Sequence, residues 1–165
     1  MKKFFLALFL LVAGFSGFSQ KAHKPNPYKI GFGAGYYALL ENPYAVDLKF
    51  YTRQGYSFEF IGYNLQESWR LAAFFNPYTP ISRDGKFRVV IGPGLHVGLW
   101  KEVYKNNGSE SNPIVGVDCL MGFEYRIPRT PIGLQIHWNP NFDLAGNTDF
   151  HYELDWAGAM IRVVF

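Results

Sequence analysis

The C-terminal stretch WAGAMIRVVF, residues 156–165, decides the fold. In an extended strand, successive side chains point to opposite faces of the sheet. Here one face of the strand is wholly apolar, and the other face carries a glycine and the charged Arg162. We interpret the stretch as the closing strand of a β-barrel in an outer membrane, because such strands alternate a lipid-facing side with an interior side. The wholly apolar face consists of Ala157, Ala159, Ile161, Val163 and Phe165.

The first 19 residues have the pattern of a cleaved export signal. A pair of lysines precedes an apolar run at residues 4–15, which is too short to span a membrane as a helix. Gly17 and Ser19 are small residues at the −3 and −1 positions of a cut before Gln20. The alternative is an N-terminal membrane anchor. No cysteine lies near the cut, which argues against a lipid anchor at this site.

Composition excludes several other classes of protein. The chain has 165 residues, 48% hydrophobic and 19% aromatic, with a mean hydropathy of −0.06. After Gln20 no apolar run reaches the roughly 20 residues that a membrane-spanning helix needs, so a helical membrane protein is excluded. The single cysteine, Cys119, cannot form an internal disulfide. A net charge of +3 without a basic run gives no indication of a nucleic-acid partner.

Alternating segments fill the rest of the chain after a polar lead-in at residues 20–27. There are eight such segments, and bacterial single-chain outer-membrane barrels have an even number of strands. We therefore predict an all-β fold, an eight-stranded antiparallel up-and-down transmembrane β-barrel at residues 28–165, with both termini in the periplasm. The expected strands are residues 28–37, 44–51, 56–63, 68–75, 87–100, 114–126, 132–139 and 152–165.

The loops should alternate between two sides of the membrane. Turns near Arg53, Asp84 and Arg129 should face the periplasm, and polar loops at residues 101–113 and 140–149 should face outward. The segment at residues 76–86 is longer than the short periplasmic turns of such barrels.

The direction of the apolar face separates a membrane barrel from a soluble ligand-binding barrel. Glycines share the opposite face with the charges, as in a narrow barrel interior. Aromatic residues gather at both ends of the apolar face, and two such girdles mark membrane interfaces. We therefore expect the apolar face to meet lipid. The expected girdle residues are Tyr36, Tyr44, Trp69 and Trp138 at the outer end, and Tyr28, Phe50, Tyr56, Phe75, Phe87 and Tyr125 at the periplasmic end.

The terminal GAMIRVVF, with the leader and the eight segments, resembles the small outer-membrane β-barrels of the OmpA/OmpX type. The resemblance implies an outer-membrane location in a Gram-negative envelope, contact with lipid and lipopolysaccharide, a monomer, and no cofactor. It also implies a C-terminal signal for the barrel-assembly machinery, formed by Gly158, Ile161, Val163 and Phe165. Pro93 departs from the pattern because it lies in mid-strand and lacks a ladder donor, and we expect a bulge or a shifted register there.

Charges of both signs are expected inside the barrel. Cross-strand pairing places Lys49 opposite Glu59 and His96 opposite Asp118, with Arg88 diagonal to Glu124. Arg162 would pair with Glu124 or Asp47. The full expected lumen network is Lys29, Asp47, Lys49, Glu59, Arg70, Arg88, His96, Asp118, Glu124, His137 and Arg162.

Such a network favours a closed polar interior, and unpaired charges in a narrow lumen would be costly. The main prediction is therefore a non-enzymatic outer-membrane protein whose loops serve envelope stability or adhesion. A small pore is the first alternative.

A lipid A-modifying enzyme is the second alternative. Lipid hydrolysis would need a nucleophile beside an oriented base. The candidate bases are His96 with Asp118, and His137 near Asn139, but no serine adjoins either histidine on its strand. Ser109 and Ser111 lie in the expected polar loop.

Metal binding is not indicated by the sequence. The four histidines lack the spacing of metal ligands, and Cys119 is expected to face lipid. Asp143 and Asp149 are expected in an outer loop, where an ordinary solvated role is favoured over binding divalent cations.

Overall fold

The chain folds into antiparallel β-strands. The computed structural model describes residues 29–37, 44–65, 68–104, 108–145, 152–153 and 156–165. No helix in this part of the chain is long and apolar enough to cross a membrane. The predicted export signal and Tyr28 lie outside the described residues. The strands are β1 (Ile30–Tyr37), β2 (Tyr44–Tyr51), β3 (Tyr56–Leu65), β4 (Ser68–Pro80), β5 (Phe87–Tyr104), β6 (Gly108–Arg126), β7 (Ile132–Trp138), β8 (Asn141–Ala145), β9 (Tyr152–Glu153) and β10 (Ala157–Val164).

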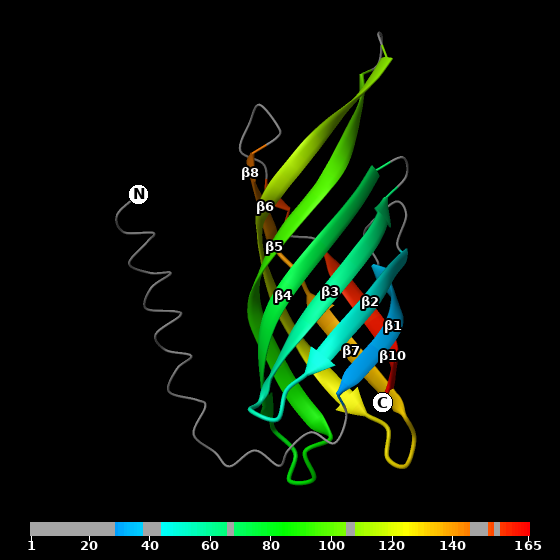
Figure 1. Cartoon of the computed structure of the whole chain (residues 1–165), viewed down its shortest axis with the longest axis vertical. Coiled ribbons are helices and arrows are strands. Elements are labelled where there is room, and N and C mark those ends of the chain that lie inside the picture. The colour runs from blue at the N-terminus through cyan, green and yellow to red at the C-terminus, as the bar shows by residue number, and fades with distance from the viewer. Residues whose placement is uncertain (1–28, 38–43, 66–67, 105–107, 146–151, 154–155) are drawn as a thin grey trace, which may run out of the picture.

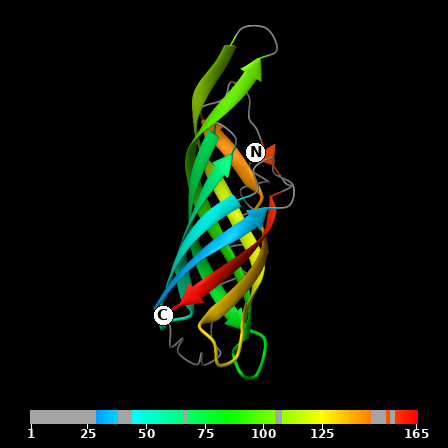
Figure 2. The same cartoon turned by 90° about the vertical axis from the view of Figure 1, so that its right-hand side faces the viewer.

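These strands close into an eight-stranded up-and-down barrel (Figures 1 and 2). Neighbours along the chain pair antiparallel, and β10 closes the ring by pairing with β1. The seventh strand consists of β7 and β8, which both pair with β6 on either side of Asn139 and Pro140. The register is continuous from β7 into β8 and shifts by one residue between Gly116 and Val115. The eighth strand consists of β9 and β10. The predicted fold class is confirmed.

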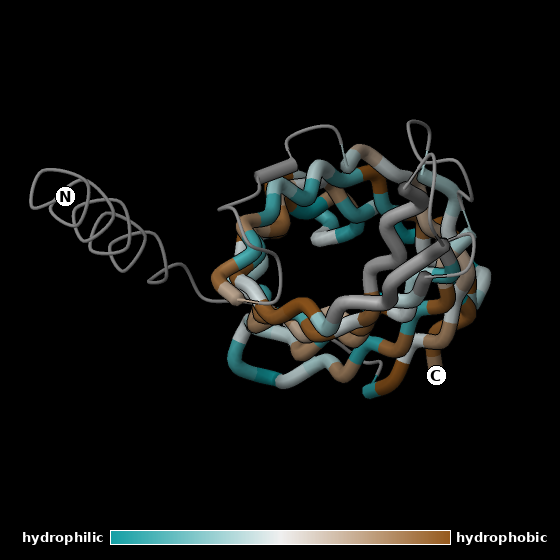
Figure 3. The backbone as a smooth tube through the Cα atoms, turned by 90° about the horizontal axis from the view of Figure 1, so that it is seen from above, coloured by the Kyte–Doolittle hydropathy of each residue, from teal (hydrophilic) through white to brown (hydrophobic). Residues whose placement is uncertain are grey.

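The barrel wall is apolar outside and polar inside. In β2, Val46 and Leu48 point outward and are exposed, while Asp47 and Lys49 point inward and are buried. The view along the barrel shows apolar and polar positions alternating around the ring (Figure 3). A soluble ligand-binding barrel would place its apolar face inward, whereas the described strands place theirs outward.

Three short turns and the C-terminus share one end of the barrel, which we call the turn end. The turn between β4 and β5 is residues 81–86, shorter than expected because β4 continues to Pro80. Within it the Ser82 hydroxyl donates to Asp84 at 2.6 Å, and Lys86 pairs with Asp84 at 2.9 Å. These bonds from Lys86 and Ser82 hold the pKa of the Asp84 carboxyl well below its usual range.

The opposite end, the loop end, carries a long hairpin. The expected polar loop at residues 101–113 is wrong, because β5 and β6 stay paired as far as Tyr104↔Gly108. This hairpin projects beyond the other strands in Figure 1. The expected loop at residues 140–149 is likewise in part strand β8. The apolar alternation of the other strands is absent from residues 101–113, and for this reason the sequence predicts a loop there.

Pro93 lies in a gap in the β4–β5 pairing that also contains Pro77, and the strand has no bulge there. The β5–β6 register runs through Pro93↔Cys119 without a shift. On the other side, β4–β5 pairing stops after Phe74↔Gly94 and resumes at Tyr78↔Val90 in the same register. A proline has no N–H to donate to the adjacent strand. The ladder therefore skips these positions while the barrel keeps its alternation.

Gly92 lies within this gap and allows close approach of the two strands. A Cβ at Gly92 would overlap the carbonyl oxygen of Phe75 and the side-chain oxygen of Asn76. We expect Gly92→Ala to lower the free energy of unfolding by about 1–3 kcal/mol because backbone must shift. Urea unfolding in detergent measures the effect. Gly133→Ala is the matched control, since its Cβ would meet only Val164 Cγ1 at 3.9 Å. Equal losses in both variants would contradict the prediction.

Candidate functional site: the charged lumen

The first group of lumen charges, the inner cluster, lies in the half of the barrel nearer the turn end. Its members come from four strands and are Asp47, Lys49, Glu59, Glu124 and Arg162, each at most 2% exposed. Arg162 is its centre: Nε pairs with Asp47, Nη2 pairs with Glu59, and Nη1 lies 3.9 Å from Glu124 Oε2. The guanidinium fork thus engages carboxylates from three different strands.

Lys49 is the second cation of the inner cluster. Its Nζ lies 2.9 Å from Glu59 Oε2 and 3.1 Å from Glu124 Oε2. Gln135 accepts from Lys49 at 2.9 Å and from Arg162 Nη1 at 2.7 Å, and it donates to Glu59 at 3.2 Å. Buried charges are tolerated when ion pairs and hydrogen bonds satisfy them. The inner cluster largely meets this condition, although Asp47 Oδ1 has no hydrogen-bond partner among the described residues.

The second group, the outer cluster, lies nearer the loop end and comprises Arg70, His96, Asp118 and Asp143. Arg70 Nη2 pairs with Asp118 Oδ1 at 2.7 Å, and the guanidinium lies 4.4 Å from the centre of the Trp156 ring. His96 has a carboxylate at each ring nitrogen, Asp118 at 3.0 Å from Nδ1 and Asp143 at 2.9 Å from Nε2. The cluster thus joins β4, β5, β6 and β8.

Aromatic and amide side chains lie between the two clusters. The Tyr37 hydroxyl donates to the Tyr63 hydroxyl at 3.2 Å and lies 2.6 Å from His137 Nε2. The rings of Tyr63 and Trp156 pack edge to face at 5.0 Å. Asn139 donates to the Tyr63 hydroxyl at 2.9 Å. This layer separates the charges of the inner cluster from those of the outer cluster.

Most of the predicted lumen network does face the interior, but one member does not. Lys29 is exposed beside the start of β1, although it has the parity of an inward residue. Its backbone N–H donates to the Phe165 carbonyl at 2.6 Å, which places it at the rim. The side chain therefore reaches solvent beyond the end of the wall.

Two cross-strand predictions need correction. His96 pairs with Gly116 and not with Asp118, and Arg88 lies directly opposite Glu124 and not diagonal to it. The β5–β6 register differs by two residues from that of the expected hairpin. Since the parity is unchanged, His96 still contacts Asp118. The pairing of Lys49 with Glu59 and of Arg162 with Asp47 is confirmed.

The predicted network contains only charged residues and histidines, so it omits several other residues that face the lumen. It also omits Arg126, which is buried beside Glu124 at the turn end, with Nε 3.5 Å from Oε1. Parity along each strand would have found most of the others. They are Tyr37, Tyr51, Tyr63, Asn76, Gln135, Asn139 and Trp156.

Of the two candidate catalytic pairs, His96 and Asp118 do meet, with His96 Nδ1 3.0 Å from Asp118 Oδ2, whereas His137 and Asn139 each bond to other side chains. Asn139 bonds to Tyr63, whereas His137 contacts Tyr37 and Gln135. The structure describes only the backbone of Ser109 and Ser111, and Asp149 lies outside the described residues. Asp143 bonds to His96 and is not a freely solvated loop residue. Within the described ranges, no group of three His, Cys, Asp or Glu side chains is arranged to hold a metal ion.

The predicted girdle residues lie on the outer face where they are described. Tyr36 and Tyr44 meet edge to face at 6.2 Å near the loop end. The ring centres of Phe87 and Tyr125 lie 6.4 Å apart near the turn end. Tyr56 is half-buried, and the remaining described members are exposed. Their role at a membrane interface stays a prediction.

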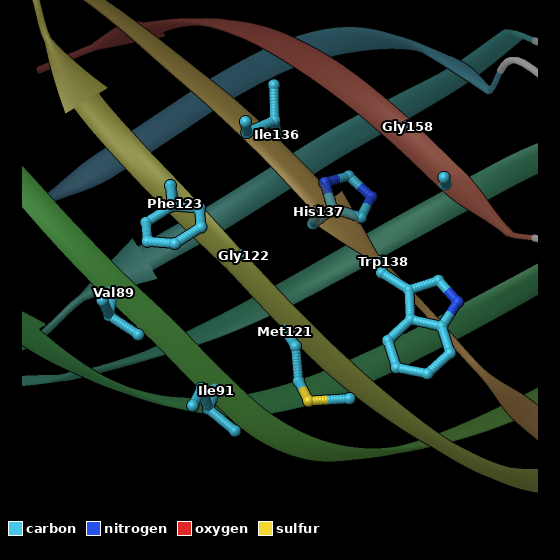
Figure 4. A pocket seen from close by; sticks show the side chains of 10 residues that line it. Val89, Ile91, Met121, Gly122, Phe123, Ile136, His137, Trp138 and Gly158 are labelled. Atoms are coloured by element: carbon cyan, nitrogen blue, oxygen red, sulfur yellow. The ribbon is translucent and has the colours of Figure 1, made fainter.

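The wall of the barrel has a shallow apolar depression over β5, β6, β7 and β10 (Figure 4). Ile91, Phe123 and Trp138 are among the side chains that surround it. Gly122 and Gly158 lie opposite His137 on the two neighbouring strands. The depression is continuous with the apolar outer face.

Comparison with known proteins reveals likeness in fold. No protein-family model matches the chain, and no curated protein matches its sequence. The crystal structure of Neisserial surface protein A (NspA) is similar with a TM-score of 0.59 at 12% identity, covering 87% of this chain and 100% of that chain. The crystal structure of the N-terminal β-barrel domain of Pseudomonas aeruginosa OprF is similar with a TM-score of 0.52 at 12% identity, covering 82% of this chain and 95% of that chain. The chain thus has the fold of the small eight-stranded outer-membrane β-barrels that its last strand resembles.

Proposed function

We propose that the chain is an integral outer-membrane protein with a closed polar lumen and no enzymatic activity. The observation that carries the proposal is the reversal of ordinary burial. Arg162, Lys49 and Glu59 are at most 1% exposed, whereas Phe32 and Ile136 on the outer face are each 60% exposed. A wall with this polarity is stable where its outer face meets hydrocarbon.

A closed lumen is supported by how the charges are used. The side chains of the inner cluster bond to one another across the interior, and the aromatic layer follows next along the axis. An ion crossing the barrel would have to displace these pairs. The lumen then serves to hold the strands in a ring, and the protein acts through its surface.

The loop end is the part proposed to meet other molecules. The β5–β6 hairpin extends past the last β4–β5 pair, Trp69↔Leu99, as far as Tyr104↔Gly108. With the turn end in the periplasm, this hairpin would stand at the level of lipopolysaccharide or above it. We propose a role in envelope stability or adhesion, with lipid and lipopolysaccharide as surroundings and the monomer as the working form.

Membrane fractionation and gel migration together test where the protein is located and whether its barrel is folded. The protein should appear in the outer-membrane fraction after removal of an export signal ending at residue 19. It should migrate faster on a gel when unheated than when boiled, because a closed barrel resists detergent. Recovery as a soluble periplasmic monomer without detergent would overturn the proposal.

Conductance tests the closed lumen. Planar bilayers containing the purified barrel should show no reproducible unitary steps. Ion-selective steps that the Lys49→Met variant alters would instead establish a pore. Lipid A from a deletion strain should keep its mass, and a mass change restored by the wild type but not by His137→Ala would support an enzyme.

Phe165 is proposed to act in assembly, with Gly158, Ile161 and Val163 of β10. Its side chain is 70% exposed on the outer face, so replacing it should remove little packing. We expect Phe165→Ala to reduce the assembled barrel in cells while leaving folding from urea into detergent unchanged. Immunoblots of unheated outer-membrane samples and refolding yields measure the two effects. Equal loss in both assays would show a stability role and contradict an assembly signal.

A further inference from the structure

The inner cluster continues toward the turn end into an excess of positive charge. Arg88 and Arg126 lie just below it, and each is 7% exposed. We call these two side chains the basic mouth. Together with the inner cluster, the described residues of this region supply four cations and three carboxylates. Asp47 and Glu59 are engaged by Arg162 and Lys49, which leaves Glu124 to face the basic mouth.

Glu124 does not neutralise this charge fully. Its Oε1 atom lies 3.6 Å from Arg88 Nη1 and 3.5 Å from Arg126 Nε, both long for charge-assisted bonds. Its Oε2 atom already receives Lys49 at 3.1 Å and the Tyr51 hydroxyl at 3.1 Å. One carboxylate oxygen is thus shared by two guanidinium groups, and Arg88 Nη1 has no hydrogen-bond partner among the described residues.

Both guanidinium groups are held in place by aromatic rings. The Arg88 guanidinium lies 4.9 Å from the centre of the Tyr78 ring, and the Arg126 guanidinium lies 4.7 Å from that of Tyr51. Arg88 Nε also donates to the Gly85 carbonyl at 3.0 Å. Stacking and this bond orient Arg88 while one of its terminal nitrogens stays unsatisfied. A buried donor of this kind gains most from an incoming anion.

The approach to the basic mouth is also positive. Asp84 is the only acidic side chain on the described residues of the three short turns, and Ser82 and Lys86 already bond to it. An anion would therefore be attracted toward the turn end before it reached the arginines. The basic side chains around that end are Lys29, Arg53, Arg83, Lys86 and Arg129.

We propose that the basic mouth is a binding site for a phosphate or carboxylate group presented at the turn end. Arg88 would supply its unsatisfied Nη1 donor, and the Arg126 guanidinium would supply the second positive charge. The rings of Tyr78 and Tyr51 fix the planes that such planar, forked recognition needs. The site does not depend on whether the lumen conducts, because it lies on the turn-end side of the inner cluster.

Titration with inorganic phosphate tests the site. The full barrel is folded in a neutral detergent, and phosphate replaces chloride at constant ionic strength while the arginine Nε–H signals are followed by NMR. The wild type should show saturable shifts of the Arg88 and Arg126 signals. Arg88→Gln should weaken binding about tenfold or more, as expected for losing a charge-assisted contact.

Controls separate a site from general screening. Arg53→Gln removes an exposed charge at the same end and should leave phosphate affinity unchanged. Arg88→Lys keeps the charge and loses the fork, so it should bind weakly even if Arg88→Gln fails to fold. Gel mobility of unheated samples verifies folding. Shifts that do not saturate, or equal weakening in Arg53→Gln and Arg88→Gln, would overturn the proposal.

A second experiment distinguishes a lipid headgroup from a soluble anion as the source of the anionic group. Phosphate binding is measured in nanodiscs of phosphatidylcholine and in nanodiscs containing phosphatidylglycerol. Competition by phosphatidylglycerol would support a lipid headgroup as the ligand. Unchanged phosphate affinity in both discs would support a soluble phosphate or carboxylate. Loss of phosphate binding in phosphatidylcholine discs as well would contradict the site.

Discussion

Replacing Arg162 with methionine is expected to lower the free energy of unfolding by about 3–5 kcal/mol, the cost of breaking a buried ion pair from one side. Arg162 is 1% exposed and pairs with both Asp47 and Glu59. Without it, two carboxylates remain buried with Lys49 as the nearest cation of the inner cluster. Urea unfolding followed by gel mobility or tryptophan fluorescence measures the loss.

A double variant distinguishes charge imbalance from lost packing. Asp47 has Arg162 as its ion-pair partner among the described residues, so Asp47→Asn removes the carboxylate that Arg162→Met would strand. The double variant should be more stable than Arg162→Met alone. Arg53→Met in an exposed turn is the control and should change stability by no more than about 0.5 kcal/mol. Additive losses in the double variant would argue against a stranded charge.

Placing arginine at Leu48 is the second change expected to have a large effect. Leu48 points outward at mid-strand between Phe32 and Phe60. In a bilayer, an arginine at the midplane of the lipid face costs about 2–4 kcal/mol, falling to about 0–1 kcal/mol near the interfaces. We expect Leu48→Arg to lose stability in lipid vesicles within the larger range.

Tyr44→Arg supplies the matched control, because Tyr44 is outward-facing at the loop end of the same strand and is 67% exposed. It should lose much less stability than Leu48→Arg. Because both residues lie on the same strand, a difference in stability between the two variants reports their different depths in the bilayer. Equal and small effects at both positions would indicate an outer face in water and would contradict a membrane belt.

Alternation in the sequence was sufficient to place most of the charged residues of the strands in the lumen. Each strand contributes side chains to one face at every second residue, so the inward position of Asp47, Lys49 and Glu59 followed from parity. Parity also survives an error in register of two residues, and for this reason His96 and Asp118 meet despite the wrong pairing. The fold class could be predicted for the same reason.

The ends of the strands and the cross-lumen contacts could not be predicted in this way. The polar residues at 101–113 have no lipid-facing pattern, so the sequence gives no sign that β5 and β6 continue there. Cross-strand arithmetic relates adjacent strands only. Arg162 on β10 reaches Glu59 on β3, and Gln135 on β7 does so too, although neither strand is next to β3. These contacts depend on side-chain length across a narrow interior.

The closing seam between β1 and β10 has a consequence for the order of folding. It runs from Gly31↔Val164 to Tyr37↔Gly158, whereas the β5–β6 hairpin runs from Phe87↔Tyr125 to Tyr104↔Gly108. The hairpin joins segments near in sequence, and the seam joins the two ends of the barrel domain, whose loop-closure entropy is far larger. The hairpin should therefore form first and the seam last. In the folded barrel, amide hydrogens along the seam should exchange before those at the centre of the hairpin.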